Sequence, residues 1–514
     1  MDTFTPDPRR WWALAALVAS MLTLGFDTTI LNVALPTMAA DLGATTGEQQ
    51  WMADAYVVVF AALMLPAGLL GDRFGRRLML VVGLGIFMAG SLAGALAGGV
   101  GTVIAARAVM GVGAALVTPL ALSVLPSLFA PEERAKAVGI TSAASALGLP
   151  LGPIVGGWLL NHFWWGSVFL VNVPMAAVGI AACLFLLPET RDPASPKVDA
   201  VSTALTATGL AALVYGIIEA PGRGWGDALV LGALGGSVVL LTALVLRERR
   251  VERPMLDMTL LAHRGFLLNT VAATLVMFVL SGLLFVLPPY LQAVLGHDAL
   301  GTGLRLLPMM GGLLVASRTA PQLTARVGAR AAVTAGLVVL AFAAFLGSRT
   351  TTDSGYGFTA LWLSVTGLGF GFALIPAMNS ALDALPRDRA GGGSGLLMPL
   401  RRGGGAIGIA RLGGLLAGPS RARLDPGGLP PRAAPTPRDS LVAAHLVAER
   451  MGPADLAAPA DSAYVHGMGV VLLVCGVAAL GSALPAAAFL PGAPRPERAP
   501  AVPVMADEEA DARQ

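Results

Sequence analysis

The sequence is dominated by apolar runs, each about as long as a lipid bilayer is thick. A hydrocarbon core about 30 Å thick needs roughly 20 apolar residues in helical conformation. Because a bilayer offers no hydrogen-bond partners to an open backbone, such runs must cross it as helices. We therefore predict an all-α polytopic membrane protein with fourteen transmembrane helices. The predicted spans are 11–36, 51–70, 78–97, 102–128, 136–160, 167–188, 201–219, 228–246, 265–294, 302–320, 331–347, 357–380, 394–418 and 464–491.

Composition supports this class and excludes several others. Of the 514 residues, 55% are hydrophobic and 13% are charged, whereas a soluble domain carries about 25% charged residues. The two cysteines, Cys183 and Cys475, lie within apolar runs, which indicates small core residues and no disulfide or metal site. No phosphate-binding loop of the Walker type occurs, and the glycine pattern Gly403–Gly408 lies inside a predicted span without a preceding strand. We therefore expect no enzyme activity, cofactor, metal or nucleic-acid partner.

A short polar turn occurs twice, each time between two apolar runs. The first copy is Gly68–Arg77 and the second is Pro321–Arg330. A turn repeated in one register indicates a duplicated helical bundle. We predict an N-terminal six-helix half at 11–188, two inserted helices with their linkers at 189–263, and a C-terminal six-helix half at 264–491. At one constant offset, the residues that correspond are Leu70, Arg73, Gly75, Arg77 and Gly83 with Leu323, Arg326, Gly328, Arg330 and Gly336.

Positive charge sets the predicted orientation in the membrane. The turns after the second, fourth, sixth, eighth and tenth spans hold most of the arginines, and the short turns on the other side hold almost none. By the positive-inside rule, both termini are predicted to lie in the cytoplasm of a multi-pass cell-membrane protein. The long loop 419–463 is then external, and the Pro- and Ala-rich segment 492–514 is a disordered cytoplasmic tail.

Three ionisable residues inside predicted spans are candidates for proton coupling. Asp27 falls in the first span, Asp54 in the second and Arg107 in the fourth. A charge inside a membrane costs about 3 kcal/mol on insertion scales, so such residues usually have a function. A carboxylate whose burial alternates can carry a proton, because a dry site raises its proton affinity and a nearby arginine lowers it. The alternative is a structural Asp–Arg pair between helices.

The fifth span contains a glycine-rich segment that is a candidate for conformational change. Its residues are Gly148, Gly152, Pro153, Gly156 and Gly157. Glycine at four-residue spacing lets helix backbones approach closely, and proline removes a backbone hydrogen bond and permits a bend. Such a helix suits rocking against a neighbour. The alternative is ordinary packing of small residues.

The first copy of the repeated turn allows two interpretations. It is either a tight cytoplasmic turn held by the positive-inside charge, or a charge latch in which Asp72 faces nearby arginines and holds the inner gate shut. The candidate gating residues are Gly68, Asp72, Arg73, Gly75, Arg76 and Arg77.

As a set, these motifs resemble the fourteen-span drug:proton antiporter branch of the major facilitator superfamily, over residues 11–491. Gly68–Arg77 resembles the turn between spans two and three of that family, and Phe26–Pro36 resembles the span-one motif of the branch. Arg107–Gly113 is similar to the span-four arginine motif, and Gly148–Gly157 to the span-five antiporter motif. Also typical of the branch, and possible substrate-cavity residues, are Glu219, Tyr290 and Gln292.

The resemblance implies a monomeric transporter built of two pseudo-symmetric six-helix halves that rock about a central site. By position, Asp27 and Arg107 would handle the proton. Gly152 and Pro153 would shape the rocking helix, and Asp72 would latch the gate.

The chain departs from the family pattern at three positions, and Glu219 has a simpler interpretation. Gly166 stands where relatives often have arginine, Arg402 stands where glutamine is usual, and Arg411 lies where the family is apolar. The last two bear on the cavity of the second half more than on the fold. Glu219, at the outer end of the seventh span, could simply extend into the outer interface.

Together these features predict a proton-coupled antiporter that exports hydrophobic or cationic drugs or antibiotics from the cytoplasm by alternating access. Its partners would be the small-molecule substrate, protons and the lipid bilayer, with the proton gradient as the energy source. Two alternatives stay open: a dedicated exporter of one metabolite or self-made antibiotic, and a non-transporting membrane sensor. The intact set of Asp27, Arg107 and Gly148–Gly157 argues against the sensor.

Overall fold

The computed structural model describes residues 10–129, 131–191, 199–251, 260, 262–385, 390–423 and 457–490. The regular elements within these ranges are helices. They are α1 (Arg10–Leu42), α2 (Thr46–Phe74), α3 (Arg76–Ala95), α4 (Val100–Ser123), α5 (Leu125–Leu128), α6 (Pro131–His162), α7 (Ser167–Leu170), α8 (Asn172–Leu186), α9 (Ala200–Arg223), α10 (Ala228–Glu248), α11 (Arg264–Pro289), the π-helix η2 (Tyr290–Val294), α12 (Ala299–Arg305), α13 (Leu307–Gly347), α14 (Tyr356–Asp383), α15 (Ala390–Arg423) and α18 (Ala457–Phe489).

Local sequence signals set several helix ends. At α2, the hydroxyl of Thr45 accepts a hydrogen bond from the backbone N–H of Glu48, and the Glu48 carboxylate accepts one from the backbone N–H of Thr45. At α9 and α10 the carboxylates of Asp199 and Asp227 act as simple N-caps, each accepting hydrogen bonds from two backbone N–H groups of the first turn. These caps satisfy N–H groups that have no partner inside the helix. Within α2, Pro66 begins a segment bent by 54° from the preceding one, as expected where proline removes a backbone hydrogen bond.

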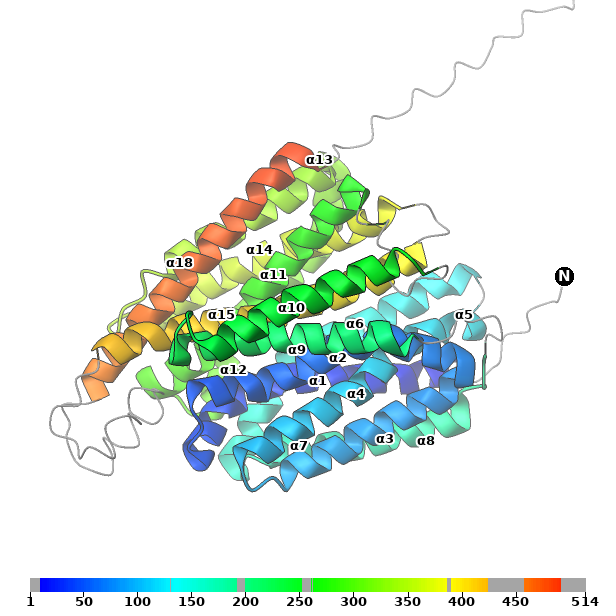
Figure 1. Cartoon of the computed structure of the whole chain (residues 1–514), viewed down its shortest axis with the longest axis horizontal. Helices are drawn as coiled ribbons and strands as arrows, with labels where there is room; N and C mark the ends of the chain where they lie inside the picture. Colours follow the sequence, from blue (N-terminus) through cyan, green and yellow to red (C-terminus); the bar gives the residue numbers. More distant parts are fainter. Residues whose placement is uncertain are drawn as a thin grey trace, which may run out of the picture.

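The helices pack as two groups with a pair between them. Helices α1 to α8 contact one another, and α11 to α18 contact one another. Helix α9 packs on α10, on α2 of the first group and on α15 of the second. Figure 1 shows α9 and α10 lying across the side of the molecule on which the two groups meet. These groups lie within the ranges predicted for the two halves and the insertion, while the domain boundaries themselves stay predictions.

The repeated turn has the same backbone geometry in both halves. Gly75, between α2 and α3, has φ of 118°, and Gly328, within α13, has φ of 83°. Both values lie in the region that favours glycine. After each turn a second glycine lets the next helix pack closely, because a Cβ at Gly83 or Gly336 would lie within contact distance of the backbone of α4 or α14. The duplication predicted from the sequence therefore extends to conformation and packing.

The described helices account for fewer membrane crossings than the fourteen predicted. Within the described ranges, ten helices are long and apolar enough to cross a bilayer, or eleven if the bent α2 counts as one span. In this count α12 and α13 form one stretch, Ala299–Gly347. Helices α6 and α15 are not among the ten. α13 alone has 41 residues, about 62 Å at 1.5 Å per residue, which is twice the hydrocarbon thickness. The break at Gly328 divides it, and fourteen crossings stay a prediction.

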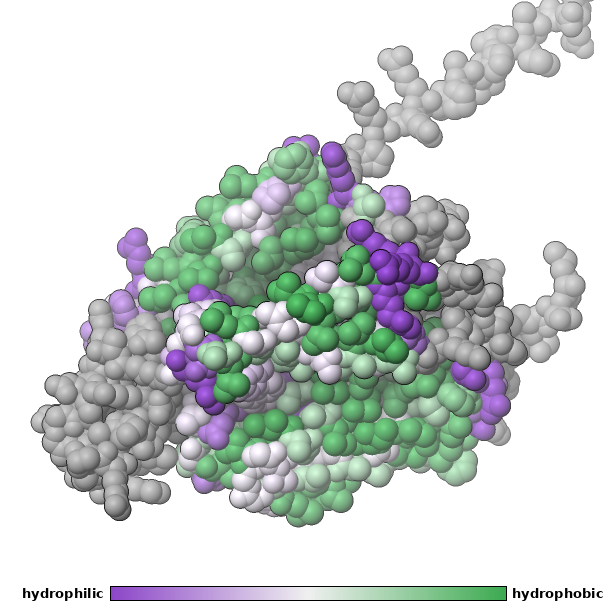
Figure 2. Space-filling model, in the orientation of Figure 1, coloured by the Kyte–Doolittle hydropathy of each residue, from purple (hydrophilic) through white to green (hydrophobic). Residues whose placement is uncertain are grey.

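The surface between the two ends of the bundle is apolar. Figure 2 shows hydrophobic side chains over most of the visible helices and hydrophilic ones gathered toward the margins. Large apolar side chains are exposed there, among them Phe185, Val239 and Leu484. An exposed apolar surface of this extent suits lipid contact rather than water.

Two predicted segments lie mainly outside the described residues. The predicted loop 419–463 is helical where it is described, because α15 continues to Arg423 and α18 begins at Ala457. The loop is therefore shorter at both ends than predicted. Residues 424–456 and the predicted tail 492–514 fall outside the described part of the chain.

We expect Gly75→Ala to lower stability by about 1–3 kcal/mol, because an alanine there is strained at positive φ. Its Cβ would also lie 2.5 Å from Oε1 of Glu189. The matched control is Gly85→Ala in α3, where a Cβ meets nothing within 4 Å. The measurement is the apparent melting temperature of both purified variants in detergent. Equal melting temperatures would contradict the account of this turn.

Candidate functional site

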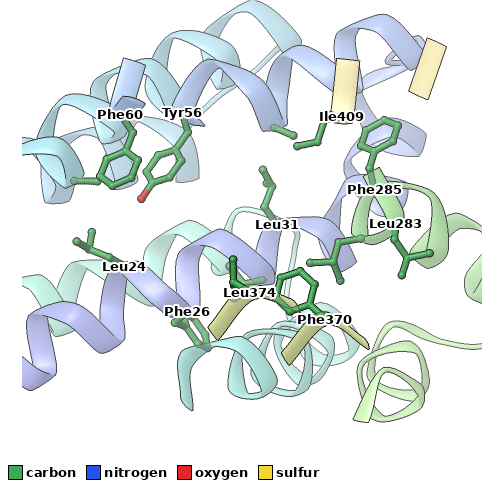
Figure 3. Close-up of a cluster of buried hydrophobic side chains, with 14 of the residues drawn as sticks. Leu24, Phe26, Leu31, Tyr56, Phe60, Leu283, Phe285, Phe370, Leu374 and Ile409 are labelled. Atoms are coloured by element: carbon green, nitrogen blue, oxygen red, sulfur yellow. The ribbon is translucent and has the colours of Figure 1, made fainter. Parts of the chain in front are cut away.

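A cavity lies between the two groups of helices. Its empty volume is about 690 Å³, including the part open to solvent. Figure 3 shows Leu31 and Tyr56 from the first group and Ile409 from the second pointing toward this shared space. The lining therefore comes from both halves. The lining residues are Thr28, Thr29, Leu31, Asn32, Ala53, Tyr56, Val57, Arg107, Met277, Leu280, Ser281, Leu284, Arg402, Gly405 and Ile409.

Asp27 and Arg107 form a buried ion pair beside this cavity. Nη1 of Arg107 lies 2.7 Å from Oδ2 of Asp27, and the two side chains are 2% and 1% exposed. The amide of Asn172 donates to Oδ1 of Asp27 at 2.9 Å, and Nε of Arg107 donates to the carbonyl of Met52 at 3.3 Å. The guanidinium also lies 4.4 Å from the ring centroid of Tyr56. A buried ion pair is tolerated only when further hydrogen bonds surround it. Here the pair joins α1 to α4, and Met52 of α2 and Asn172 of α8 supply these hydrogen bonds.

The sequence predicted part of this cluster. Asp27 and Arg107 were expected to act together, and the structure brings them into contact. Asn172 and Tyr56 were not expected. Asn172 begins α8 and is fully buried, so the signal that could have found it is a lone amide inside an apolar run.

Asp54 lies apart from the Asp27–Arg107 pair. It is fully buried, and neither carboxylate oxygen has a hydrogen-bond partner within the described residues. On α2 it shares a face with Gln50 and Val58, four residues to either side. The amide of Gln50 donates to the carbonyls of Ile409 and Ala410 on α15, and Val58 packs in an apolar cluster with residues of α9 and α15. Asp54 therefore occupies the junction of both halves and the insertion.

The glycine-rich segment of α6 packs on two helices. Gly148, Gly152 and Gly156 face α1, where a Cβ would meet the backbone or side chains of residues 25–30. Gly157 faces α12 of the other half, where a Cβ would meet the backbone of residues 299–300. A Cβ on Gly303 of α12 would in turn clash with the carbonyl of Pro153. The small residues thus let α6 and α12 approach across the boundary between the halves.

Polar contacts join the halves at the same end. The amide of Asn161, at the end of α6, donates to Oδ2 of Asp298, the N-cap of α12. Gln292 donates to the carbonyl of Val33 at 2.9 Å, which links η2 to α1. The hydrogen bond from Asn161, followed by one from the backbone of Gly301, holds the pKa of the Asp298 carboxyl below its ordinary value. We term this the closed end; it lies opposite the basic end, which carries Gly68–Arg77.

The charged turn at the basic end contacts α4 and the segment that follows α8, and no interaction among the described residues joins it to the second half. Arg76 pairs with Asp72 at 2.8 Å and donates to the carbonyl of Ser123 on α4 at 2.9 Å. The carboxylate of Glu189 accepts the backbone N–H groups of Arg77 and Leu78, which caps α3. The sequence did not single out Glu189. These contacts hold the turn against α4 and against the segment that follows α8. A latch between the halves stays a prediction.

The remaining turn residues have structural surroundings. Arg73 lies 5.7 Å from the ring centroid of Phe74 at the exposed end of α2. Gly68 lies against α4, where a Cβ would meet Pro119 at 3.8 Å. Arg73 makes no ion pair among the described residues.

The three possible substrate-cavity residues do not line the central cavity. Glu219 pairs with Arg223 at 2.9 Å and borders a separate pocket at the closed end, with Trp51. Tyr290 is buried, and its hydroxyl has no partner within the described residues. Gln292 bonds to α1, as described above. A binding role for these three stays a prediction.

The two unusual arginines of α15 have different environments. Arg402 lines the cavity, and its guanidinium lies 4.9 Å from the ring centroid of Phe60. Arg411 lies 4.9 Å from the ring centroid of Trp225 and is not part of the cavity lining. The sequence offered no partner for Arg411. The exposed Trp225, in the turn between α9 and α10, supplies it.

Helices arranged as two packed groups, with a cavity between them and contacts at one end, form an architecture typical of membrane transporters built from two halves. The model of the major facilitator superfamily matches residues 17–409. The chain belongs to this superfamily. It is a multi-pass membrane transporter and not an enzyme.

Named relatives support the same family. Over 440 residues the chain is 35% identical to the puromycin resistance protein of Streptomyces alboniger, covering 83% of this chain and 86% of that protein. It is 32% identical to the tetracenomycin C resistance and export protein of Streptomyces glaucescens over 506 residues, covering 96% and 94%. The crystal structure of a bacterial homologue of the human lysosomal transporter Spinster matches the fold with a TM-score of 0.68, at 20% identity and covering 94% and 98%.

Cysteine cross-linking tests the closed end. We expect the double variant Asn161→Cys with Asp298→Cys to form a disulfide on mild oxidation, because the native side chains are in contact. The control is Arg73→Cys with Arg326→Cys, which places the pair at the equivalent turns of the two halves, at the basic end. The native Cys183 and Cys475 are buried, so background labelling is low. Efficient cross-linking of the control and none of the first pair would contradict the described arrangement.

Proposed function

We propose that this transporter exports hydrophobic drugs or antibiotics from the cytoplasm in exchange for protons, acting as a monomer with fourteen transmembrane helices. The observation that supports it most is the cavity lined by both halves, with contacts between the halves at one end. Rocking of one half against the other would close the cavity at the basic end and open it at the closed end.

The direction of opening follows from charge. Arg76, Arg77 and Arg247 lie at the basic end, and positively charged turns favour the cytoplasmic side. Both termini are then cytoplasmic, and the closed end faces outward. In this orientation the described conformation faces the cytoplasm and is ready to take up substrate.

The substrate class rests on the relatives and on the cavity wall. The two Streptomyces relatives named above are a puromycin resistance protein and a tetracenomycin C resistance and export protein. Apolar side chains such as Leu31, Met277 and Leu284 make up much of the lining, which suits hydrophobic compounds. A dedicated exporter of one self-made compound has the same architecture, and a substrate panel separates it from a multidrug exporter.

Two carboxylates are proposed to couple protons to export. Asp27 is balanced by Arg107 in this conformation, and its release from that pair would let it take a proton. Asp54 has no partner within the described residues, and an unpaired charge in a dry interior is costly, so Asp54 is the second candidate carrier. Because Asp54 lies where α2 meets α15, loss of its proton would weaken that contact. Each inward charge gains about 2.3 kcal/mol per 100 mV.

We expect Asp27→Asn to lower the initial rate of proton-coupled export at least about tenfold. The protein should still insert into the membrane and purify as a monodisperse peak. The amide oxygen still accepts a hydrogen bond from Arg107, and its NH2 group can donate to Oδ1 of Asn172 once that amide turns over, because this oxygen has no partner within the described residues. The titrating group is removed. The assay is dye or drug accumulation in inverted membrane vesicles given a proton gradient, with gradient collapse as the zero. Asp41→Asn, at the exposed end of the same helix, is the matched control. Wild-type rates for the Asp27 variant would remove Asp27 as a proton carrier.

Asp54→Asn is expected to behave differently. The amide resembles the neutral acid in size and charge, so stability should change by no more than about 1 kcal/mol. The pH dependence of export should flatten over the pH range of the assay, because one titrating group at the α2–α15 contact is gone. Initial rates across this range, in the same vesicles, give the profile. An unchanged profile in a stable Asp54→Asn protein would show that Asp54 takes no part.

A further inference from the structure

The charges around the central cavity are of one sign. Among its lining residues two are arginines, Arg107 and Arg402, and none is acidic. Asp27 lies behind Arg107 and is 1% exposed. The sequence predicted hydrophobic or cationic substrates. The lining does not favour cations, since the acidic side chain is already bound and covered.

Only one of the two arginines is neutralised. Arg107 is paired with Asp27 at 2.7 Å. Arg402 is half-buried and makes no ion pair within the described residues. Its neighbour Arg401 donates to the sulfur of Met378 and brings no compensating charge. A guanidinium in an apolar cavity without a counter-charge is a binding site for an anionic group, because that group can supply the missing partner.

An aromatic surface lies between the two arginines. The rings of Tyr56 and Phe60 stack with centroids 5.9 Å apart and planes 12° apart. Arg107 lies over Tyr56 at 4.4 Å, and Arg402 lies over Phe60 at 4.9 Å. Each guanidinium is held on a ring face by a cation–π contact. Figure 3 shows Tyr56 and Phe60 side by side on one wall, with the Tyr56 hydroxyl directed into the open space.

From this arrangement we propose that the transported compounds are aromatic organic anions, whose carboxylate or phenolate binds Arg402 and whose rings lie in the apolar part of the cavity. This rests on the proposed export function and specifies its substrate class. The apolar part of the lining, with Leu280, Leu284 and Ile409, accepts the ring system. Export of an anion moves negative charge outward, so an inside-negative potential favours it by about 2.3 kcal/mol per 100 mV.

A matched set of three compounds tests the proposal. Anthracene-9-carboxylate, its carboxamide and an anthracenylmethyl trimethylammonium ion share one ring system and differ in charge. Full-length protein in liposomes with a proton gradient is given each compound, and uptake is followed by fluorescence. We expect the wild-type protein to move the carboxylate about tenfold faster than the ammonium ion, since a charge-assisted hydrogen bond is strong enough for that ratio.

Three variants isolate the role of Arg402. Arg402→Gln should slow carboxylate transport about tenfold and leave the carboxamide rate unchanged. Arg402→Lys should retain most of the carboxylate preference, because the charge remains. Arg411→Gln removes an arginine of the same helix that lies on Trp225 and outside the cavity lining, and should match the wild type.

The outcomes separate the two proposals. An unchanged ratio of carboxylate to carboxamide transport in Arg402→Gln overturns the anion assignment, as does wild-type preference for the ammonium ion. In both cases export itself stands. If the wild type moves none of the three, nor any dye of a wider panel, the export proposal fails. In that case, binding of the carboxylate to detergent-solubilised protein tests the anion assignment. If the assignment is right, Arg402→Gln weakens binding of the carboxylate about tenfold. Equal affinities of the wild type and the variant overturn the assignment.

Discussion

The interaction on which the N-terminal half depends is the buried pair of Asp27 and Arg107. Two charges taken out of water lose several kcal/mol of solvation each, and their attraction repays this only with good geometry and further hydrogen bonds. The structure meets both conditions, with Asn172 on the carboxylate, the Met52 carbonyl on the guanidinium and the Tyr56 ring beneath it. Since these residues come from α1, α2, α4 and α8, the pair ties four helices into one body. A half held in this way can move as a unit.

Contacts between the halves follow a different principle. At the closed end, α6 and α12 approach through Gly157 and Gly303, with no large side chain between them, and single hydrogen bonds from Asn161 and Gln292 span the boundary. Such contacts are specific but individually weak, at about 0.5–1.5 kcal/mol for a hydrogen bond. They can therefore form and break during a transport cycle. The insertion adds a third element, because α9 touches α2 and α15 beside Asp54.

Residues with a local signature could be predicted from the sequence, and residues defined by distant neighbours could not. Gly75 and Gly328 share one register in two copies of a turn, and both have the positive φ that explains the glycine. Asp27 and Arg107 were expected because charges in apolar runs are rare. Their partner Asn172 is 145 residues away from Asp27, and an asparagine gives no charge signal.

The residues that line the cavity could also not be predicted from the sequence alone. Glu219 was a reasonable candidate from its type and span, yet its carboxylate pairs with Arg223 one turn along α9. Arg402 was noted as a departure from a family pattern, and only the packing of α15 against α2 shows that it faces the cavity over Phe60. Which face of a helix meets a cavity depends on tilt and on contacts between the halves. Neither is encoded in the periodicity of one segment.

The most direct test of this account is a pair of distances measured in the membrane. Spin labels at Leu78 and Val327, both exposed near the basic end, report on one end of the two halves, and labels at His162 and Thr351, exposed at the other end, report on the closed end. Double electron–electron resonance is recorded in liposomes at neutral and acidic pH, with and without substrate. The account predicts that the first distance shortens when the second lengthens. Two distances that stay fixed under all conditions, or that change together in the same direction, would contradict it.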